Sequence, residues 1–153
     1  MVKKSLHHTI YYEEILNRIS ALSEDSTPKW GKMNAAQMLH HCHLILQIPL
    51  RKIELPKLHF LLKAVGIATK KEIQIFNNGI PHNMPTFKKV IVNFECDFHE
   101  AEKNLQITLK EYLETYKNND LPGNHALFGV MTPEDWGFLE YKHLNHHLKQ
   151  FNV

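Results

Sequence analysis

Four long segments of this chain place apolar residues at the spacing of an amphipathic α-helix, and turn-forming residues separate the segments. The predicted helices run from Thr9 to about Leu22, from Asn34 to the residues before Pro49, from Asp97 to about Lys117, and from Thr132 to near the C-terminus. A helix with one apolar face has to bury that face against another element. The sequence therefore predicts an all-α fold in which the four helices form a bundle.

Start signals mark three of these helices. Asn34 with Gln37, and Asp97 with Glu100, have the spacing of a capping box, in which the two side chains pair with backbone amides that the helix leaves free. Pro133 lies at the first position of the last helix, where its missing N–H removes no helical hydrogen bond. These starts define which side chains share a helix face.

The connection before the third long helix is predicted to be irregular. A short helix is expected from Leu55 to about Val65, ended by Gly66. The following stretch, from Thr69 to Phe94, is rich in turn residues, and its runs KEIQIF and KKVIVNF are each candidates for a brief strand. The prolines of this stretch, which make it a candidate lid or dimer contact, are Pro81 and Pro85.

Length and charge exclude several classes of protein. The chain has 153 residues and is expected to form one domain, 1–153. Its net charge of +2 gives no basic surface for a nucleic-acid partner. No apolar run reaches the roughly 18 to 20 residues of a membrane span, and the N-terminus lacks the apolar region of a signal peptide. With only two cysteines and no disulfide framework, a cytoplasmic location is expected.

The unusual feature of the composition is its twelve histidines, and helix geometry sorts those of the second helix. Each residue turns a helix by about 100°, so Met38 and Ile45 lie within about 60° of His41. His40 and His43 fall on the opposite, more polar arc. His41 is therefore predicted to face inward, and His40 and His43 are predicted to face water.

The last helix divides its histidines in the same way. Trp136, Leu139 and His147 lie within about 40° of His143. His143 and His147 are therefore predicted to share the inward face, four residues apart on neighbouring turns. His146 lies at the edge of that face.

Three inward imidazoles from two helices suggest a metal site. Burying them without partners is unfavourable, whereas neutral imidazole is a good ligand for zinc, nickel, copper and iron. Three ligands leave a position open for water or substrate, as in catalytic sites. The alternative is a set of core histidines hydrogen-bonded to Glu140, Gln150 or loop carbonyls.

The other histidines are predicted to lie outside the inward set. His82 and His125 lie in loops and are candidates for the mouth of a pocket. Surface or local positions are expected for the others, which are His7, His8, His40, His43, His59 and His99.

Two stretches carry a resemblance to a known family. WGKMNAAQMLHHC (residues 30–42) and LFGVMTPEDWGFLEYKHLNHHLKQF (residues 127–151) resemble the DinB-like (YfiT-like) superfamily, and within it a branch known only as a domain of unknown function. The superfamily pattern has one histidine in the second helix and an HxxxH in the last, often as HxxHHxxQ. Here these positions are His41, His143 and His147, with His146 and Gln150 completing the longer pattern.

The resemblance implies a fold and a chemistry. Members have an up-down-down-up four-helix bundle, are commonly homodimers, and hold a divalent metal ion, here zinc or nickel, on the three histidines. Characterised relatives include thiol-dependent transferases and isomerases that use low-molecular-weight thiols. The implied function is a metal-dependent thiol S-transferase acting on a small molecule, with Glu140 as a candidate base or partner of a ligand. The chain departs from its branch at His125-Ala126, where relatives tend to have His-Pro.

Three alternatives stay open from the sequence. A metal-bound hydroxide would make the protein a hydrolase. A fourth protein ligand, from His146, His125 or Glu140, would close the coordination sphere and make it a non-catalytic metal-binding bundle. A purely structural bundle would bind no metal.

Overall fold

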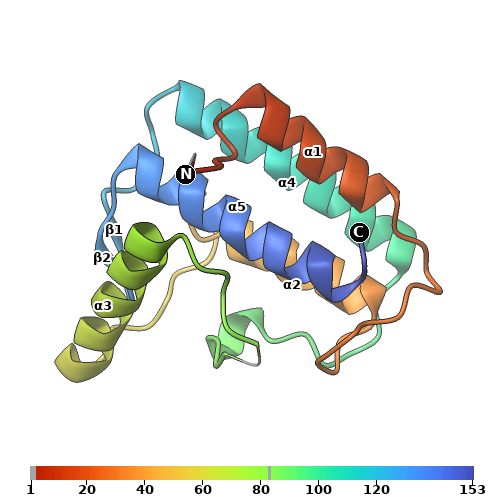
Figure 1. Ribbon diagram of the computed structural model, residues 1–153, viewed down its shortest axis with the longest axis horizontal. Coiled ribbons are helices and arrows are strands. Elements are labelled where there is room, and N and C mark those ends of the chain that lie inside the picture. Colours follow the sequence, from red (N-terminus) through yellow and green to blue (C-terminus); the bar gives the residue numbers. More distant parts are fainter. Residues whose placement is uncertain (1–2, 83) are drawn as a thin grey trace.

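The computed structural model describes residues 3–82 and 84–153, and within these ranges it is predominantly helical, as predicted (Figure 1). Two antiparallel strands of two residues each pair with one another, with Asn124 opposite Val130 and His125 opposite Gly129. In chain order the elements are α1 (Thr9–Ser20), α2 (Ala35–Leu46), α3 (Phe60–Phe76), the 3-10 helix η1 (Lys88–Val90), α4 (Phe98–Lys117), β1 (Asn124–His125), β2 (Gly129–Val130) and α5 (Pro133–Gln150).

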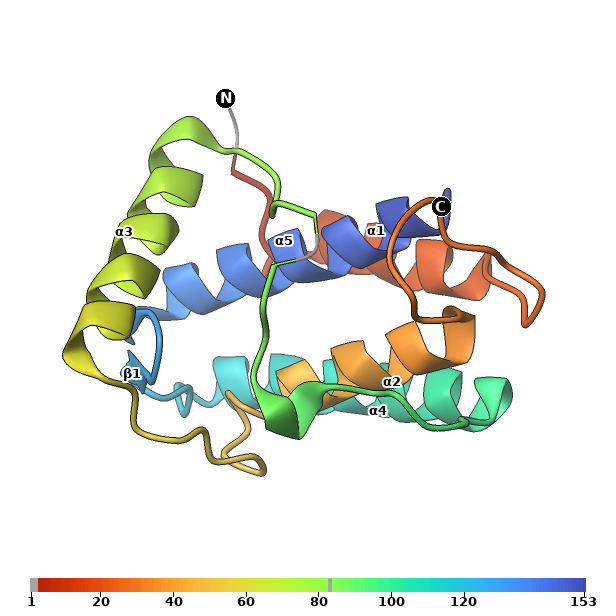
Figure 2. The ribbon, with the colours of Figure 1, turned by 90° about the horizontal axis from the view of Figure 1, so that it is seen from below.

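Helices α1, α2, α4 and α5 pack against one another. Helix α2 lies along α4, and α5 contacts both α1 and α2 (Figures 1 and 2). Leucines fill the space between them, and these are Leu39, Leu46, Leu105, Leu109, Leu144 and Leu148. The predicted starts are confirmed, because Asn34 and Gln37 form a complete capping box and Asp97 accepts from the Glu100 amide.

Truncating one of these leucines should destabilise the fold strongly. Leu109 is fully buried, so Leu109→Ala is expected to lower the free energy of unfolding by about 2 to 5 kcal/mol, through lost burial and the cavity left behind. Ile107 lies on the same helix and is 53 % exposed, so Ile107→Ala is expected to cost less than about 1 kcal/mol. Urea unfolding monitored by circular dichroism measures both. Equal losses for the two variants would contradict the assignment of the α4 inner face.

The connection differs from the sequence prediction in three places, and the first is that its helix begins at Phe60 and not at Leu55. The helix predicted to end before Gly66 continues to Phe76, so KEIQIF forms the last turns of α3 and the predicted strand is wrong. Gly66 lies inside the helix, where it allows close packing: a Cβ there would collide with the carbonyl and side chain of Leu127. The second predicted strand, KKVIVNF, starts as η1, and the described residues 91–94 form no strand.

Helix α3 stands apart from the other helices at one end of the molecule (Figure 2). Its inner face supplies Ile73 to a second apolar cluster with Met131 and Trp136. Its outer face exposes large apolar side chains, which are Phe60, Leu61, Leu62, Val65, Ile75 and Phe76. Neither α3 nor any other helix in the described ranges is long and apolar enough to cross a membrane.

Candidate metal centre

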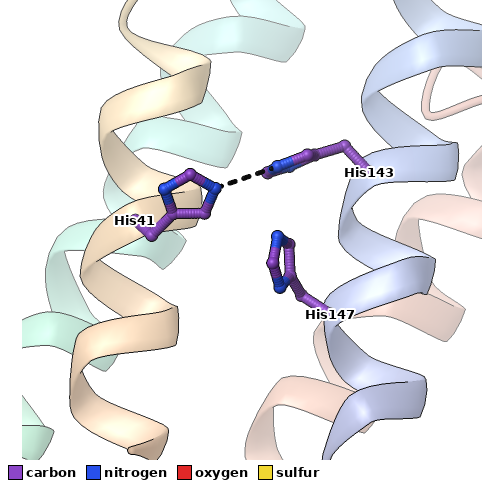
Figure 3. Close-up of side chains that lie close together, drawn as sticks. All are labelled: His41, His143 and His147. Carbon is purple, nitrogen blue, oxygen red and sulfur yellow. Dashed lines mark hydrogen bonds between the residues drawn. The ribbon is translucent and has the colours of Figure 1, made fainter. Parts of the chain in front are cut away.

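His41 of α2 and His143 and His147 of α5 point toward one another across the gap between the two helices (Figure 3). One ring nitrogen of each lies within 4.8 Å of the corresponding nitrogens of the other two. His41 Nε2 and His143 Nε2 are 3.2 Å apart. Two imidazole nitrogens bound to one tetrahedral zinc, at bonds of about 2.0 to 2.1 Å, would be about 3.3 Å apart. The spacing therefore fits a shared ion.

Hydrogen bonds hold two of the rings in the orientation that metal binding needs. His41 Nδ1–H donates to the carbonyl of Val90 at 2.7 Å. His147 Nδ1–H donates to Gln150 Oε1 at 2.9 Å, and the amide of Gln150 is itself fixed because its Nε2 donates to the Trp30 carbonyl. With the proton on Nδ1, each Nε2 keeps a free lone pair. Such outer partners are typical of histidines that bind metals.

Burial keeps the three histidines neutral. Loss of hydration lowers the pKa of His41, and lowers the pKa of His143 well below its ordinary value, helped there by the neighbouring imidazoles. Burial and the nearby His41 lower the pKa of His147 to about 3. Neutral imidazole is the form that binds a cation, so the site is ready for a metal at physiological pH.

Two buried polar atoms beside the cluster have no hydrogen-bond partner among the described residues. They are His143 Nδ1 and Glu140 Oε2, from consecutive turns of α5. Glu140 is only 5 % exposed, and burial raises the pKa of its carboxyl group to about 8. Unpaired buried groups are rare in folded proteins and cluster where a ligand or ion binds.

The histidines lie in the wall of a cavity of about 470 Å³. Most of its walls are apolar, from α2, α3, α5 and the segments around η1 and β2, with Ile45, Ile73, Phe87, Phe128, Trp136 and Leu139 as examples. Its only Lys, Arg, Asp or Glu residues in the described part of the chain are Lys32 and Glu140. The volume is that of a typical small-molecule site.

Comparison with known proteins gives a family. The model of a family described as a protein of unknown function, DUF1569, matches residues 1–153. The chain belongs to the DUF1569 family. Searches of the curated proteins and of the solved structures found no match. The family description carries no activity, so any function has to be argued from the site.

In this DUF1569 chain the structure places the other histidines in several settings. His82 stacks on Trp30 with ring centroids 3.9 Å apart, and His146 lies beside both. Trp30 and His146 line the cavity. His125 also lines the cavity, and it is buried. Of the two loop histidines predicted as candidates for the mouth of a pocket, His125 lines the cavity, whereas His82 lies against Trp30.

Three histidines are less exposed than predicted, and one of them, His40, is half-buried. His43 was expected to face water, but it is half-buried, and its Nδ1 lies 2.7 Å from Thr108 Oγ1 on α4. His7 was expected at a surface position, but its Nε2 lies 2.9 Å from the buried Tyr112 hydroxyl. The predictions for His43 and His7 failed because α4 packs against both side chains, and this long-range contact is not revealed by the period of a single helix.

The carbonyl partners of the metal candidates were missed by the sequence reasoning. Val90 and Trp30 contribute backbone oxygens, which every residue has, so no residue type marks them. In the DUF1569 site these carbonyls fix the ring of His41 directly and that of His147 through Gln150.

The role of Gln150 in this DUF1569 site can be tested by removing its polar group. Gln150→Leu is expected to weaken zinc binding by about 10- to 100-fold, because His147 would lose the acceptor that fixes its tautomer. The exposed neighbour Lys149, replaced by alanine, is the matched control and should bind as the wild type does. Competition with a chelating dye gives both dissociation constants. An unchanged constant for Gln150→Leu would show that the hydrogen bond does not support a ligand.

Proposed function

We propose that this protein is a metal-dependent enzyme in which His41, His143 and His147 hold a divalent cation, zinc or nickel. The observation that carries the proposal is the convergence of imidazole nitrogens from two buried histidines and one half-buried histidine within 4.8 Å in the wall of an apolar cavity. The residues fit such an ion, because hydrogen bonds on Nδ1 leave Nε2 free on two of the rings. The substrate is then a small molecule bound in the cavity.

We further propose that the chain is a DinB-like protein with an up-down-down-up bundle. The chain directions in Figure 2 support this, since the colours of α1 and α5 advance from left to right and those of α2 and α4 from right to left. The same proposal includes a homodimer, which the resemblance implies, and a cytoplasmic location, which follows from the absence of a disulfide framework among only two cysteines.

The proposed reaction is transfer of a low-molecular-weight thiol to an electrophilic small molecule. A bound divalent cation supplies Lewis acidity and favours the thiolate form of a coordinated thiol. The apolar walls would hold the electrophile and exclude water. Lys32, exposed beside the cavity, would pair with a carboxylate of the thiol. Glu140, with its raised pKa, would be protonated at pH 7. Its first role would therefore be to donate a hydrogen bond or a proton, and it could act as a base only after losing that proton.

A metal-dependent hydrolase is the second candidate. No fourth histidine, cysteine, aspartate or glutamate joins the cluster in the described ranges. Three protein ligands leave a coordination position open for water or a thiol, so the site suits a hydrolase as well as a transferase. The open position disfavours a non-catalytic site closed by His146, His125 or Glu140.

Metal analysis tests the proposal first. Protein purified without a nickel column should contain about one equivalent of zinc or nickel, removable by a chelator. A content below about a tenth of an equivalent, unchanged in His143→Ala, would overturn the metal-dependent function.

A panel of thiols with a model epoxide then separates the two reactions. Metal-dependent loss of both thiol and epoxide indicates transfer. Metal-dependent opening of the epoxide without thiol indicates hydrolysis. If metal-loaded protein catalyses neither reaction, the proposed activity is contradicted, although the metal site itself is not.

A further inference from the structure

His125 is fixed in the cavity wall by two hydrogen bonds from its own loop. The backbone amides of Leu127 and Phe128 both donate to His125 Nδ1, at 3.0 and 3.2 Å. The ring also stacks on Phe128, with centroids 4.8 Å apart, and meets Trp136 edge-on. The tautomer and the orientation of the imidazole are therefore both determined by the fold.

An imidazole that accepts on Nδ1 has to carry its proton on Nε2 when it is neutral. Burial, with a smaller effect of Lys70, lowers the pKa of His125 to about 4, so the ring is neutral at pH 7. His125 Nε2–H is thus a donor under physiological conditions. Among the described residues it has no acceptor, although the side chain is only 8 % exposed.

The surroundings of this donor are apolar. Besides Phe128 and Trp136, the ring lies near Phe87, with centroids 6.3 Å apart, and all of these residues line the cavity. Lys70, the cation that influences His125, is paired with Asp135 at 3.3 Å and donates to the Val130 carbonyl, so it is engaged elsewhere. A single fixed N–H in an apolar wall favours a ligand that brings an acceptor, because a ligand without one would displace water from the donor and leave it unpaired.

We infer that His125 binds the substrate: its Nε2–H donates to an uncharged acceptor oxygen, such as a carbonyl, on an otherwise apolar or aromatic molecule. The inference deepens the proposed function. It rests on that function for the claim that the other end of the ligand binds at the histidine cluster. It assigns the cavity to an uncharged electrophile, since the apolar walls offer no partner to a charged group away from Lys32 and Glu140.

Two probes isolate the hydrogen bond. Benzophenone and 1,1-diphenylethylene have the same shape and differ only in a carbonyl oxygen against a methylene group. Their affinities for wild-type protein and for His125→Asn are measured by quenching of tryptophan fluorescence. The ratio of the two affinities is compared between proteins, so the different hydration of the probes cancels. Titrations are run on metal-free protein and on protein with one equivalent of zinc.

Asparagine is the informative replacement because it separates the two roles of His125. Its side-chain oxygen can accept from the amides two and three residues ahead, as in an Asx turn, and so keeps the loop. It is too short to place a donor where Nε2 lies. Circular dichroism and thermal unfolding of His125→Asn check that the fold is kept.

The expected result is that the ketone-to-alkene affinity ratio falls by about 2- to 10-fold in His125→Asn, while the affinity for the alkene is unchanged. An unchanged ratio in a folded variant would overturn the inference, as would wild-type protein that binds neither probe. Zinc binding is measured separately. If the protein binds no zinc, the ketone-to-alkene affinity ratio measured on metal-free protein still tests the role of His125.

A direct measurement covers the case in which His125→Asn does not fold. In wild-type protein with ¹⁵N-labelled histidine, the His125 Nε2–H resonance should shift when benzophenone is added and should shift less with 1,1-diphenylethylene. Protonation on Nδ1 instead of Nε2, or equal shifts with the two probes, would overturn the inference.

Discussion

Replacing His147 with alanine is expected to lower the affinity for zinc by at least about 100-fold. Loss of an outer partner of a metal ligand typically costs about 10- to 100-fold, and loss of the ligand itself should cost more. The two remaining imidazoles, His41 and His143, would bind the ion in competition with water. Isothermal titration with a chelator as competitor measures the constant, and elemental analysis after dialysis measures retained metal.

His146→Ala is the matched control for this experiment. His146 lies next to His147 in the sequence and lines the same cavity, but it is not part of the metal-binding group. Its replacement should leave the zinc constant within about threefold of the wild type. A His147→Ala protein that binds zinc as tightly as the wild type, or an equal loss in the two variants, would contradict the assigned ligand set.

The second large effect is expected from Glu140→Gln in metal-free protein. Burial raises the folded-state pKa of Glu140 from the ordinary 4.5 to about 8. Between these two pH values the folded state binds a proton that the unfolded state has lost, so this group makes folding less favourable as pH rises. Glutamine cannot ionise. The stability of Glu140→Gln relative to wild type should therefore increase by up to about 1.4 kcal/mol per pH unit.

The gain of the variant should level off above pH 8, at a value on the order of 4 kcal/mol relative to its value at pH 4. The lowered pKa values of the buried histidines reduce stability as pH falls below about 6.5, but they do so in both proteins and cancel in the difference. Denaturant unfolding in the presence of a chelator, from pH 4 to pH 9, gives the curve. Glu134→Gln, at an exposed position of the same helix, is the control. A difference that does not vary with pH would mean that Glu140 ionises normally.

Local patterns in the sequence were enough to predict most of the helices. The starts of α2 and α4 follow from capping residues, because a cap acts within a few positions of its own helix. The inward direction of His41, His143 and His147 follows from the helical period in the same way. The full extent of α3 was not predictable, because glycine is common just past a helix end, whereas here Gly66 lies inside the helix and makes a long-range contact with Leu127.

The sequence by itself determined which three imidazoles could meet, since a rigid helix carries its side chains at fixed angles. Only the tertiary structure decided what surrounds them. The Val90 carbonyl that orients His41 and the loop amides that fix His125 are backbone groups without a residue signature. The apolar cavity arises from residues distant in the chain, among them Ile73 and Phe128. Such groups are brought together by long-range packing, which no local period encodes.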